Sequence, residues 1–220
     1  MYSFLKRLID LLISGITFLI FLPLFLPICI LQLLTGEGYV FYFQKRIGFK
    51  NQYFNIWKFA TMLKDSPNMG TGSITLRNDP RVTPMGKFLR PTKLNEFPQV
   101  INVLKGDLSI VGPRPLVDRT FNAYSPEIRD KIYNVKPGIT GIGSIIFRDE
   151  EDLISNSGEE PHTFYERVVA PYKGALEMWY QKNASIYTDL MIIFLTAWVI
   201  LFKKSDLPYR VFKDLPKRTF

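Results

Sequence analysis

Apolar residues open the chain in an uninterrupted run, since none of the 24 residues from Leu11 to Leu34 is charged. As a helix, this stretch is roughly 36 Å long, which exceeds a membrane hydrocarbon core of about 30 Å. Pro23 and Pro27 lie near its middle. An interior proline removes a helix hydrogen bond and bends the chain. The pattern therefore predicts a membrane segment with a break at the two prolines.

The charges on both sides of this run favour a re-entrant hairpin. Lys6 and Arg7 precede it, and Lys45, Arg46 and Lys50 follow it. Because basic flanks stay on the cytoplasmic side, both ends are expected at the same membrane face. Two arms of about 12 residues each reach roughly 18 Å, about half-way across the core. A single kinked helix that spans the membrane is the alternative.

Beyond the apolar run the pattern predicts helices and one short hairpin of strands. Aromatic and β-branched residues over 39–43 and 53–57 indicate the strands, with a turn at 48–51 between them. Residues 65–84 and 136–141 are expected to be loops, because they are rich in glycine and proline.

Three further segments have helical spacing of their apolar residues: 86–104 with an interruption near Pro98, 164–187, and 190–202. The last two suit interfacial amphipathic helices. The alternative for 164–187 is a purely structural surface helix, and the alternative for 190–202 is packing in the core. The fold class expected is α+β, mostly helical, with a re-entrant membrane helix-break-helix and a small cytosolic domain.

We expect the chain to divide into a re-entrant membrane hairpin over 1–35, a cytosolic membrane-associated domain over 36–202, and a basic C-terminal tail over 203–220. The 220 residues include 28 basic and 20 acidic ones, a net charge of +8. Residues 36–105 hold 11 of the basic and four of the acidic residues, a net charge of +7. The positive charge is therefore concentrated directly after the membrane segment.

Composition excludes several classes of protein. Cys29 is the single cysteine, so an internal disulfide is excluded, and His162 is the single histidine, which excludes a histidine-rich metal site. Walker-type and dinucleotide-binding glycine patterns are absent from the sequence. A basic excess fits nucleic acid, anionic lipid or phosphorylated substrates. No nucleic-acid recognition motif is present, so a nucleic-acid partner is not expected.

Basic residues of the middle segment are distributed around one acidic residue, Glu96. They are Lys58, Arg77, Arg81, Arg90, Lys93 and Arg114. Arginine forks and lysine ammonium groups bind phosphate oxygens, and backbone amides of glycine-rich turns add donors. These residues predict a phosphate site next to a membrane, and the alternative is a patch that binds anionic lipid headgroups.

A series of short motifs then resembles a known family, the bacterial sugar transferases or monotopic phosphoglycosyl transferases. The motifs are Lys6-Arg7-x-x-Asp10, Gln44-Lys45-Arg46-Ile47-Gly48, Trp57-Lys58-Phe59-Ala60-Thr61-Met62, Asp79-Pro80-Arg81-Val82-Thr83, Leu94-Asn95-Glu96-Phe97-Pro98-Gln99, Asn102-Val103-Leu104-Lys105-Gly106-Asp107, Val111-Gly112-Pro113-Arg114-Pro115 and Pro137-Gly138-Ile139-Thr140-Gly141. They occur in the family's order from about residue 5 to 202.

The resemblance implies a monotopic enzyme on the cytosolic face of the bacterial inner membrane. Such enzymes move a phosphosugar from a UDP-sugar onto polyprenyl phosphate, release UMP and use Mg²⁺, which begins the synthesis of a lipid-linked glycan. The expected partners are therefore the UDP-sugar, polyprenyl phosphate and membrane lipids, with a homodimer also considered.

Family members use an adjacent Asp-Glu pair, in which the Asp forms a covalent phosphosugar intermediate and the Glu helps to bind the metal. Here the resemblance assigns catalysis to Asn95 and Glu96 and the metal to Glu96. Substrate phosphates are assigned to Lys58, Arg81, Arg90, Arg114, Gly138, Thr140 and Gly141, and the membrane break to Pro23 and Pro27.

Asn95 departs from the family at the nucleophile itself. An amide has no anionic oxygen with which to form an acyl-phosphate. Four interpretations are open: a catalytically silent relative that binds the same ligands, a trapping substitution, a different nucleophile such as Glu96 or the acidic residues 149–152, and direct transfer without a covalent step. A solvated loop is the alternative for residues 149–152. A binding module without turnover is the alternative function.

Overall fold

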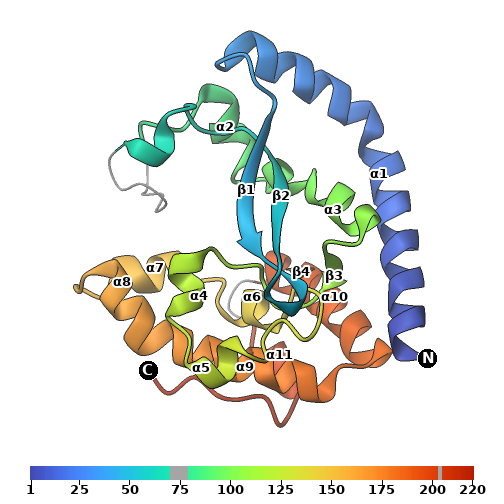
Figure 1. Cartoon of the computed structure of the whole chain (residues 1–220), viewed down its shortest axis with the longest axis vertical. Helices are drawn as coiled ribbons and strands as arrows, with labels where there is room; N and C mark the ends of the chain where they lie inside the picture. Colours follow the sequence, from blue (N-terminus) through green and yellow to red (C-terminus); the bar gives the residue numbers. More distant parts are fainter. Residues whose placement is uncertain (70–78, 203–204) are drawn as a thin grey trace. The chain divides into compact units, whose positions relative to one another are not determined.

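The computed structural model describes residues 1–69, 79–202 and 205–220, and this part of the chain is mostly helical (Figure 1). The helices are α1 Tyr2–Thr35, α2 Pro84–Leu89, α3 Gln99–Lys105, α4 Asp118–Asn122, α5 Pro126–Arg129, α6 Ile142–Ile146, α7 Glu150–Ser155, α8 Pro161–Phe164, α9 Ala170–Asn183, α10 Ile186–Leu201 and α11 Leu207–Val211. Single helical turns lie at η1 Phe49–Asn51, η2 Ser66–Asn68, η3 Leu94–Glu96 and η4 Tyr165–Val169. The strands are β1 Phe41–Ile47, β2 Tyr53–Phe59, β3 Ser109–Val111 and β4 Gly138–Thr140.

Helix α1 is continuous, so the predicted break is wrong. Pro23 and Pro27 lie inside the helix, which bends in its second half without ending (Figure 1). Each proline removes one hydrogen-bond donor, but the long apolar residues around it keep the helical backbone. Helix α1 is long and apolar enough to cross a membrane, and only 6% of its most apolar stretch is buried within the protein.

The chain folds into two compact units, each built from segments that are separated in the sequence. The first unit holds residues 1–10, 45–54 and 106–220, and the second holds residues 11–44 and 55–105. Helix α1 and the β1–β2 hairpin each contribute residues to both units. Each unit is described by itself below.

The predicted hairpin is confirmed: β1 begins two residues later than predicted and ends at Ile47, and β2 begins at Tyr53 as predicted and ends two residues later. Strands β1 and β2 form a two-stranded sheet, and the turn between them has Lys50 and Asn51 at positive φ. Within the second unit, Phe43 and Trp57 pack edge to face with ring centroids 4.8 Å apart. Such cross-strand aromatic pairs stabilise a short sheet.

A second sheet pairs β3, for which no element was predicted, with β4, which lies in a segment predicted to be a loop. Strand β3 pairs in parallel with β4, with Ser109 opposite Gly138 and Val111 opposite Thr140. The backbones approach so closely that a Cβ on Gly112 would lie 2.2 Å from the carbonyl oxygen of Lys136. Glycine at position 112 therefore permits this pairing. The strands were not predicted because three residues are too few to show the alternation typical of a strand.

The core of the first unit is formed largely by α6, α9 and α10, shown in yellow to red in Figure 1. Helices α9 and α10 confirm the helical spacing seen in the sequence. The segment expected to be a basic tail also belongs to this core: Phe212 and Leu215 are 6% and 3% exposed. The indole nitrogen of Trp179 donates to Asp214 at 2.9 Å.

Candidate active site

In the second unit, Lys58 and Glu96 form an ion pair. Lys58 lies on β2 and Glu96 ends the turn η3, and their Nζ and Oε1 atoms are 3.4 Å apart. The two side chains are 16% and 19% exposed. A partly exposed carboxylate and ammonium group are thus held together, although 38 residues separate them in the sequence.

Asn102 holds the elements that carry this pair. From α3 its side chain accepts a hydrogen bond from the backbone nitrogen of Trp57 at 2.9 Å and donates to the carbonyl of Asn55 at 2.8 Å. Asn102 is completely buried. Both bonds attach α3 to β2, one of them at Trp57, directly before Lys58. Asn102 had no role assigned from the sequence, where the available signal was a polar residue on the apolar side of a predicted helix.

Asn95 lies beside Glu96 in the same turn. Its side-chain oxygen is buried and has no hydrogen-bond partner within the described part of the chain. An unsatisfied buried polar atom costs about 1–3 kcal/mol and calls for an explanation, such as a water, an ion or a ligand. Lys93, just before the turn, has a φ of 60°, which is uncommon for a residue other than glycine. The turn therefore carries both an unusual backbone and an unsatisfied oxygen.

The two described arginines of this unit, Arg81 and Arg90, differ in their surroundings. Arg90 is partly buried at the end of α2, and its guanidinium donates to the Thr61 hydroxyl at 3.3 Å. Arg81 is 3% exposed, with Nε 2.9 Å from Asp79 and Nη1 2.9 Å from the carbonyl oxygen of Ser66. These contacts make Arg81 part of the packing of its own loop. Arg77 lies outside the described residues.

The other predicted site residues belong to the first unit. Gly138 and Thr140 lie on β4 and Gly141 follows it, while Arg114 follows β3. The Tyr133 hydroxyl donates to the carbonyl oxygen of Arg114 at 2.8 Å. The predicted residues therefore form two groups, one in each unit.

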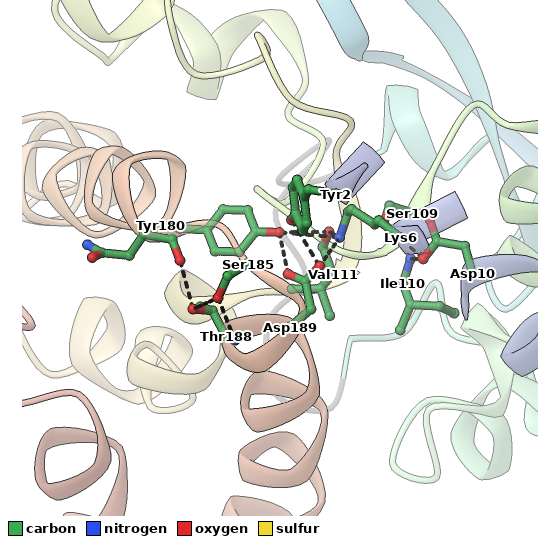
Figure 2. Close-up of polar contacts among 11 residues, drawn as sticks. Tyr2, Lys6, Asp10, Ser109, Ile110, Val111, Tyr180, Ser185, Thr188 and Asp189 are labelled. Carbon is green, nitrogen blue, oxygen red and sulfur yellow. Dashed lines mark hydrogen bonds and ion pairs between the residues drawn. The ribbon is translucent and has the colours of Figure 1, made fainter. Parts of the chain in front are cut away.

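A polar network in the first unit holds the start of α1 against β3 (Figure 2). The Lys6 ammonium group donates to the Asp189 carboxylate at 2.8 Å and to the Val111 carbonyl at 2.9 Å. One oxygen of Asp10 accepts from the Ser109 hydroxyl at 3.0 Å and the Ile110 amide at 2.9 Å. Asp189 was not singled out from the sequence, although it is the one charged residue between Ile186 and Leu201.

Residues 1–203 match the family described as bacterial sugar transferase. The chain belongs to this family. It is 36% identical over 203 residues to a UDP-N-acetylgalactosamine-undecaprenyl-phosphate N-acetylgalactosaminephosphotransferase of Aeromonas hydrophila, which covers 91% of this chain and 44% of that protein. It is 32% identical over 212 residues to an undecaprenyl-phosphate galactose phosphotransferase of Salmonella typhimurium, covering 90% of this chain and 40% of that protein.

A third relative of this sugar transferase is similar over most of both chains. The exopolysaccharide production protein ExoY of Rhizobium meliloti is 33% identical over 215 residues, covering 91% of this chain and 87% of ExoY. The chain thus spans less than half the length of the Aeromonas and Salmonella relatives and most of ExoY.

The oxygen donors of this sugar transferase fit a magnesium ion. Mg²⁺ prefers oxygen ligands and is usually held by one or two carboxylates together with substrate phosphates. Glu96 supplies a carboxylate, and the buried oxygen of Asn95 lacks a partner among the described residues. No cluster of three or more histidine, cysteine or acidic side chains occurs in the ranges that the structure describes. A magnesium ion at these oxygens would therefore take its remaining ligands from a substrate.

The acidic residues 149–152, an alternative source of a nucleophile, begin a helix instead of forming a solvated loop. Asp149 accepts hydrogen bonds from Arg218 at 2.6 and 2.8 Å, and Glu150 accepts one from Lys173 at 2.6 Å. Arg218 lowers the pKa of the Asp149 carboxyl through hydrogen bonding. Both carboxylates thus take part in ion pairs that connect segments of the first unit.

Proposed function

We propose that this chain transfers a phosphosugar from a UDP-sugar to polyprenyl phosphate and releases UMP, as the first membrane step in the synthesis of a lipid-linked glycan. The observation that supports it is the Lys58–Glu96 pair beside the unsatisfied oxygen of Asn95. These residues lie in the motifs of a family whose relatives are named for transfer to undecaprenyl phosphate.

Each group of residues has a role in this proposal. Lys58 and Arg90 bind and neutralise the diphosphate, since cations near transferring phosphoryl groups stabilise their negative charge. Arg114 and the backbone of Gly138, Thr140 and Gly141 contribute further phosphate contacts. Arg81 acts as a positioning residue, because Asp79 and backbone carbonyls already receive its hydrogen bonds.

Glu96 and the oxygen of Asn95 would hold magnesium, which neutralises charge on the phosphates when bound. The described residues orient the substrate around that position. Lys58 keeps Glu96 in place, and Asn102 keeps the strand of Lys58 against α3. The amide nitrogen of Asn95 can donate a hydrogen bond to a phosphate oxygen, which a carboxylate in the same position cannot do.

Two routes for the transfer are consistent with Asn95. In the first, an oxygen of Glu96 attacks the β-phosphorus, the bond to UMP breaks, and a polyprenyl phosphate oxygen then attacks the same phosphorus and releases Glu96. In the second, the polyprenyl phosphate oxygen attacks the β-phosphorus directly and UMP leaves in one step. A covalent phosphosugar on Glu96 distinguishes the first route from the second.

The test is UMP release from a panel of UDP-sugars with polyprenyl phosphate and Mg²⁺. We expect release by the unchanged chain, at least equal release by Asn95→Asp, and a loss of about 100-fold in Glu96→Gln. Intact-protein mass spectrometry of each reaction reports any phosphosugar adduct. An absence of release by both the unchanged chain and Asn95→Asp across the panel would contradict the proposal.

A second candidate function is a membrane module that binds a sugar nucleotide without turnover, and the observation that favours it is the neutral side chain at position 95. In this case the unchanged chain binds UDP-sugar in calorimetry but releases no UMP. Asn95→Asp then acquires turnover, which separates this function from the transferase.

We also propose that α1 enters and leaves the membrane at its cytosolic face. Support comes from the basic residues on both sides of the apolar run and from the bend in the second half of α1 (Figure 1), the helix that contains Pro23 and Pro27. Single cysteines introduced as Ser3→Cys and Glu37→Cys in a Cys29→Ser background test it. Both should react with an impermeant maleimide only from the cytosolic side, whereas a spanning helix would expose them on opposite sides.

A further inference from the structure

A buried carboxylic acid lies in the first unit, in a position that the proposed chemistry does not use. Glu177 is on α9, is 2% exposed, and its Oε2 atom has no hydrogen-bond partner in the described ranges. Burying a carboxyl group without such a partner is unfavourable. The presence of this carboxyl group in a core made largely of apolar and aromatic side chains therefore calls for a reason other than stability.

The carboxyl group of Glu177 is packed against the backbone of α6. A Cβ atom on Gly143 would lie 2.4 Å from Oε1 and 3.3 Å from Cδ of Glu177. No side chain fits at position 143 unless the carboxyl group moves. Helix α6 begins at Ile142, directly after Gly141. Glu177 thus contacts the helix that continues the chain from β4.

The ionisable neighbours of Glu177 come from several elements. Lys173, one turn earlier on α9, is 4% exposed and donates to Glu150 of α7. The carboxyl group also interacts electrostatically with three buried tyrosine hydroxyls, those of Tyr124, Tyr133 and Tyr165. Burial and the nearby Glu150 raise the pKa of the Tyr165 hydroxyl, and Arg114 lowers it.

One of these tyrosines, Tyr133, connects Glu177 to the loop that carries Arg114. The Tyr133 hydroxyl donates to the carbonyl of Arg114 and accepts from the amide of Leu116. Glu177 therefore contacts α6 directly and influences a side chain that supports the Arg114 loop. Burial raises the pKa of Glu177 to about 7, and the nearby Lys173 opposes this effect.

We propose that Glu177 is a positioning residue for the transfer reaction: in its neutral form, its carboxyl group fixes the position of α6 and with it β4 and Gly141, which contact the substrate phosphates. This inference rests on the proposed function. A neutral carboxylic acid is tolerated in this dry site, whereas the ionised form is strongly disfavoured and displaces its surroundings. Deprotonation near neutral pH should therefore increase the mobility of α6 and of β4 and Gly141 before it.

The first test adds side-chain volume at position 143 and removes it at position 177. Gly143→Ala places a methyl group against the carboxyl group, and Glu177→Ala leaves a gap there. Each should reduce UMP release by about 100-fold, because small displacements of binding groups have effects of this size. In the double variant the added methyl group occupies space vacated by the carboxyl group, so we expect about tenfold recovery over either single variant.

Hydrogen exchange of residues 137–147 in the same variants gives a readout that does not need turnover. Faster exchange in Gly143→Ala, slowed again in the double variant, supports the contact even if no variant releases UMP, so a failure of the proposed function is distinguishable. Unchanged exchange in Gly143→Ala, or no recovery in the double variant, would overturn the inference.

The second test uses Glu177→Gln, which keeps the shape of the side chain but cannot ionise. The folded pKa is above the ordinary value, so the folded state holds the proton more tightly and loses stability as the pH rises from about 4.5 to about 7. We expect kcat of the unchanged chain to fall as the pH rises through about 7, with KM less affected, and kcat of Glu177→Gln to stay level over this range. Glu166→Gln, at an exposed position, should keep the unchanged profile. Identical profiles for Glu177→Gln and the unchanged chain would overturn the role of the proton.

Discussion

Asn95 is the residue on which the proposed transfer depends most. It keeps the size of the aspartate that the family resemblance expects but carries no charge, and its oxygen is buried without a partner in the described chain. The neighbouring Glu96 is held by Lys58, so one carboxylate and one cation remain adjacent to the substituted position. The resemblance expects negative charge on two adjacent acidic residues, and here only Glu96 carries it.

Because of this arrangement, we expect transfer activity to depend strongly on Lys58. Lys58→Met removes the positive charge next to Glu96, and we expect UMP release to fall about 100-fold, because such a cation acts on charge that develops during transfer. The melting temperature should also fall, since the two side chains are only 16% and 19% exposed and the substitution leaves the Glu96 carboxylate without this counter-charge. Lys87→Met, at an exposed position on α2, is the matched control. Equal activity losses in both variants would show that Lys58 acts only through general surface charge.

At the scale of elements, α1 is attached to the protein by polar residues near both ends of an apolar helix. Lys6 and Asp10 hold its start to residues of the first unit (Figure 2). Near its end, the Gln32 side chain is 1% exposed and donates to the carbonyl oxygen of Ala60 in the second unit at 2.6 Å. Within each unit, such buried bonds fix which side of the helix faces its neighbours, since apolar contacts alone are not directional.

Removal of the carboxylate that receives Lys6 should therefore destabilise the first unit. Asp189→Ala leaves a largely buried ammonium group without its counter-charge, and we expect a loss of about 3 kcal/mol. Thermal unfolding in detergent measures the change. Asp206→Ala is the matched control, because the Asp206–Arg210 pair is exposed and its loss should have no measurable effect. A similar melting temperature for both variants would contradict the anchoring role.

At the scale of the whole molecule, distant parts of the sequence share each unit. The first unit combines the first ten residues, the turn of the hairpin and the C-terminal half of the chain. Its core reaches to Leu215, so the end of the chain contributes to stability as well as to charge. The +4 charge of residues 203–220 does not, by itself, make this segment a flexible tail.

A single substitution near the C-terminus tests this conclusion. Phe212 packs against Trp179 with ring centroids 4.9 Å apart, and Phe212→Ala should cost about 3–5 kcal/mol of stability. Phe220→Ala, at a side chain that is 47% exposed, is the control and should cost far less. If unfolding in denaturant gave the same midpoint for both variants, the terminal segment would not belong to the core in solution.

The sequence alone determined the properties that are local or that depend on the order of motifs. The apolar run predicted α1, the aromatic residues predicted the β1–β2 hairpin, and the helical spacing predicted α9 and α10. The ordered motifs indicated the family, which the match over residues 1–203 confirms. These signals need only neighbouring residues, because helix and strand periods and turn residues are encoded over a few positions.

Tertiary structure alone decided the contacts between distant residues. It kept α1 continuous through two prolines, paired β3 with β4, and placed Glu177 against Gly143. Strands of three residues have no readable period, and a buried carboxyl group looks the same in the sequence as an exposed one. Which polar groups are buried, and what they contact, follows from packing between segments far apart in the chain, so only the folded structure reveals it.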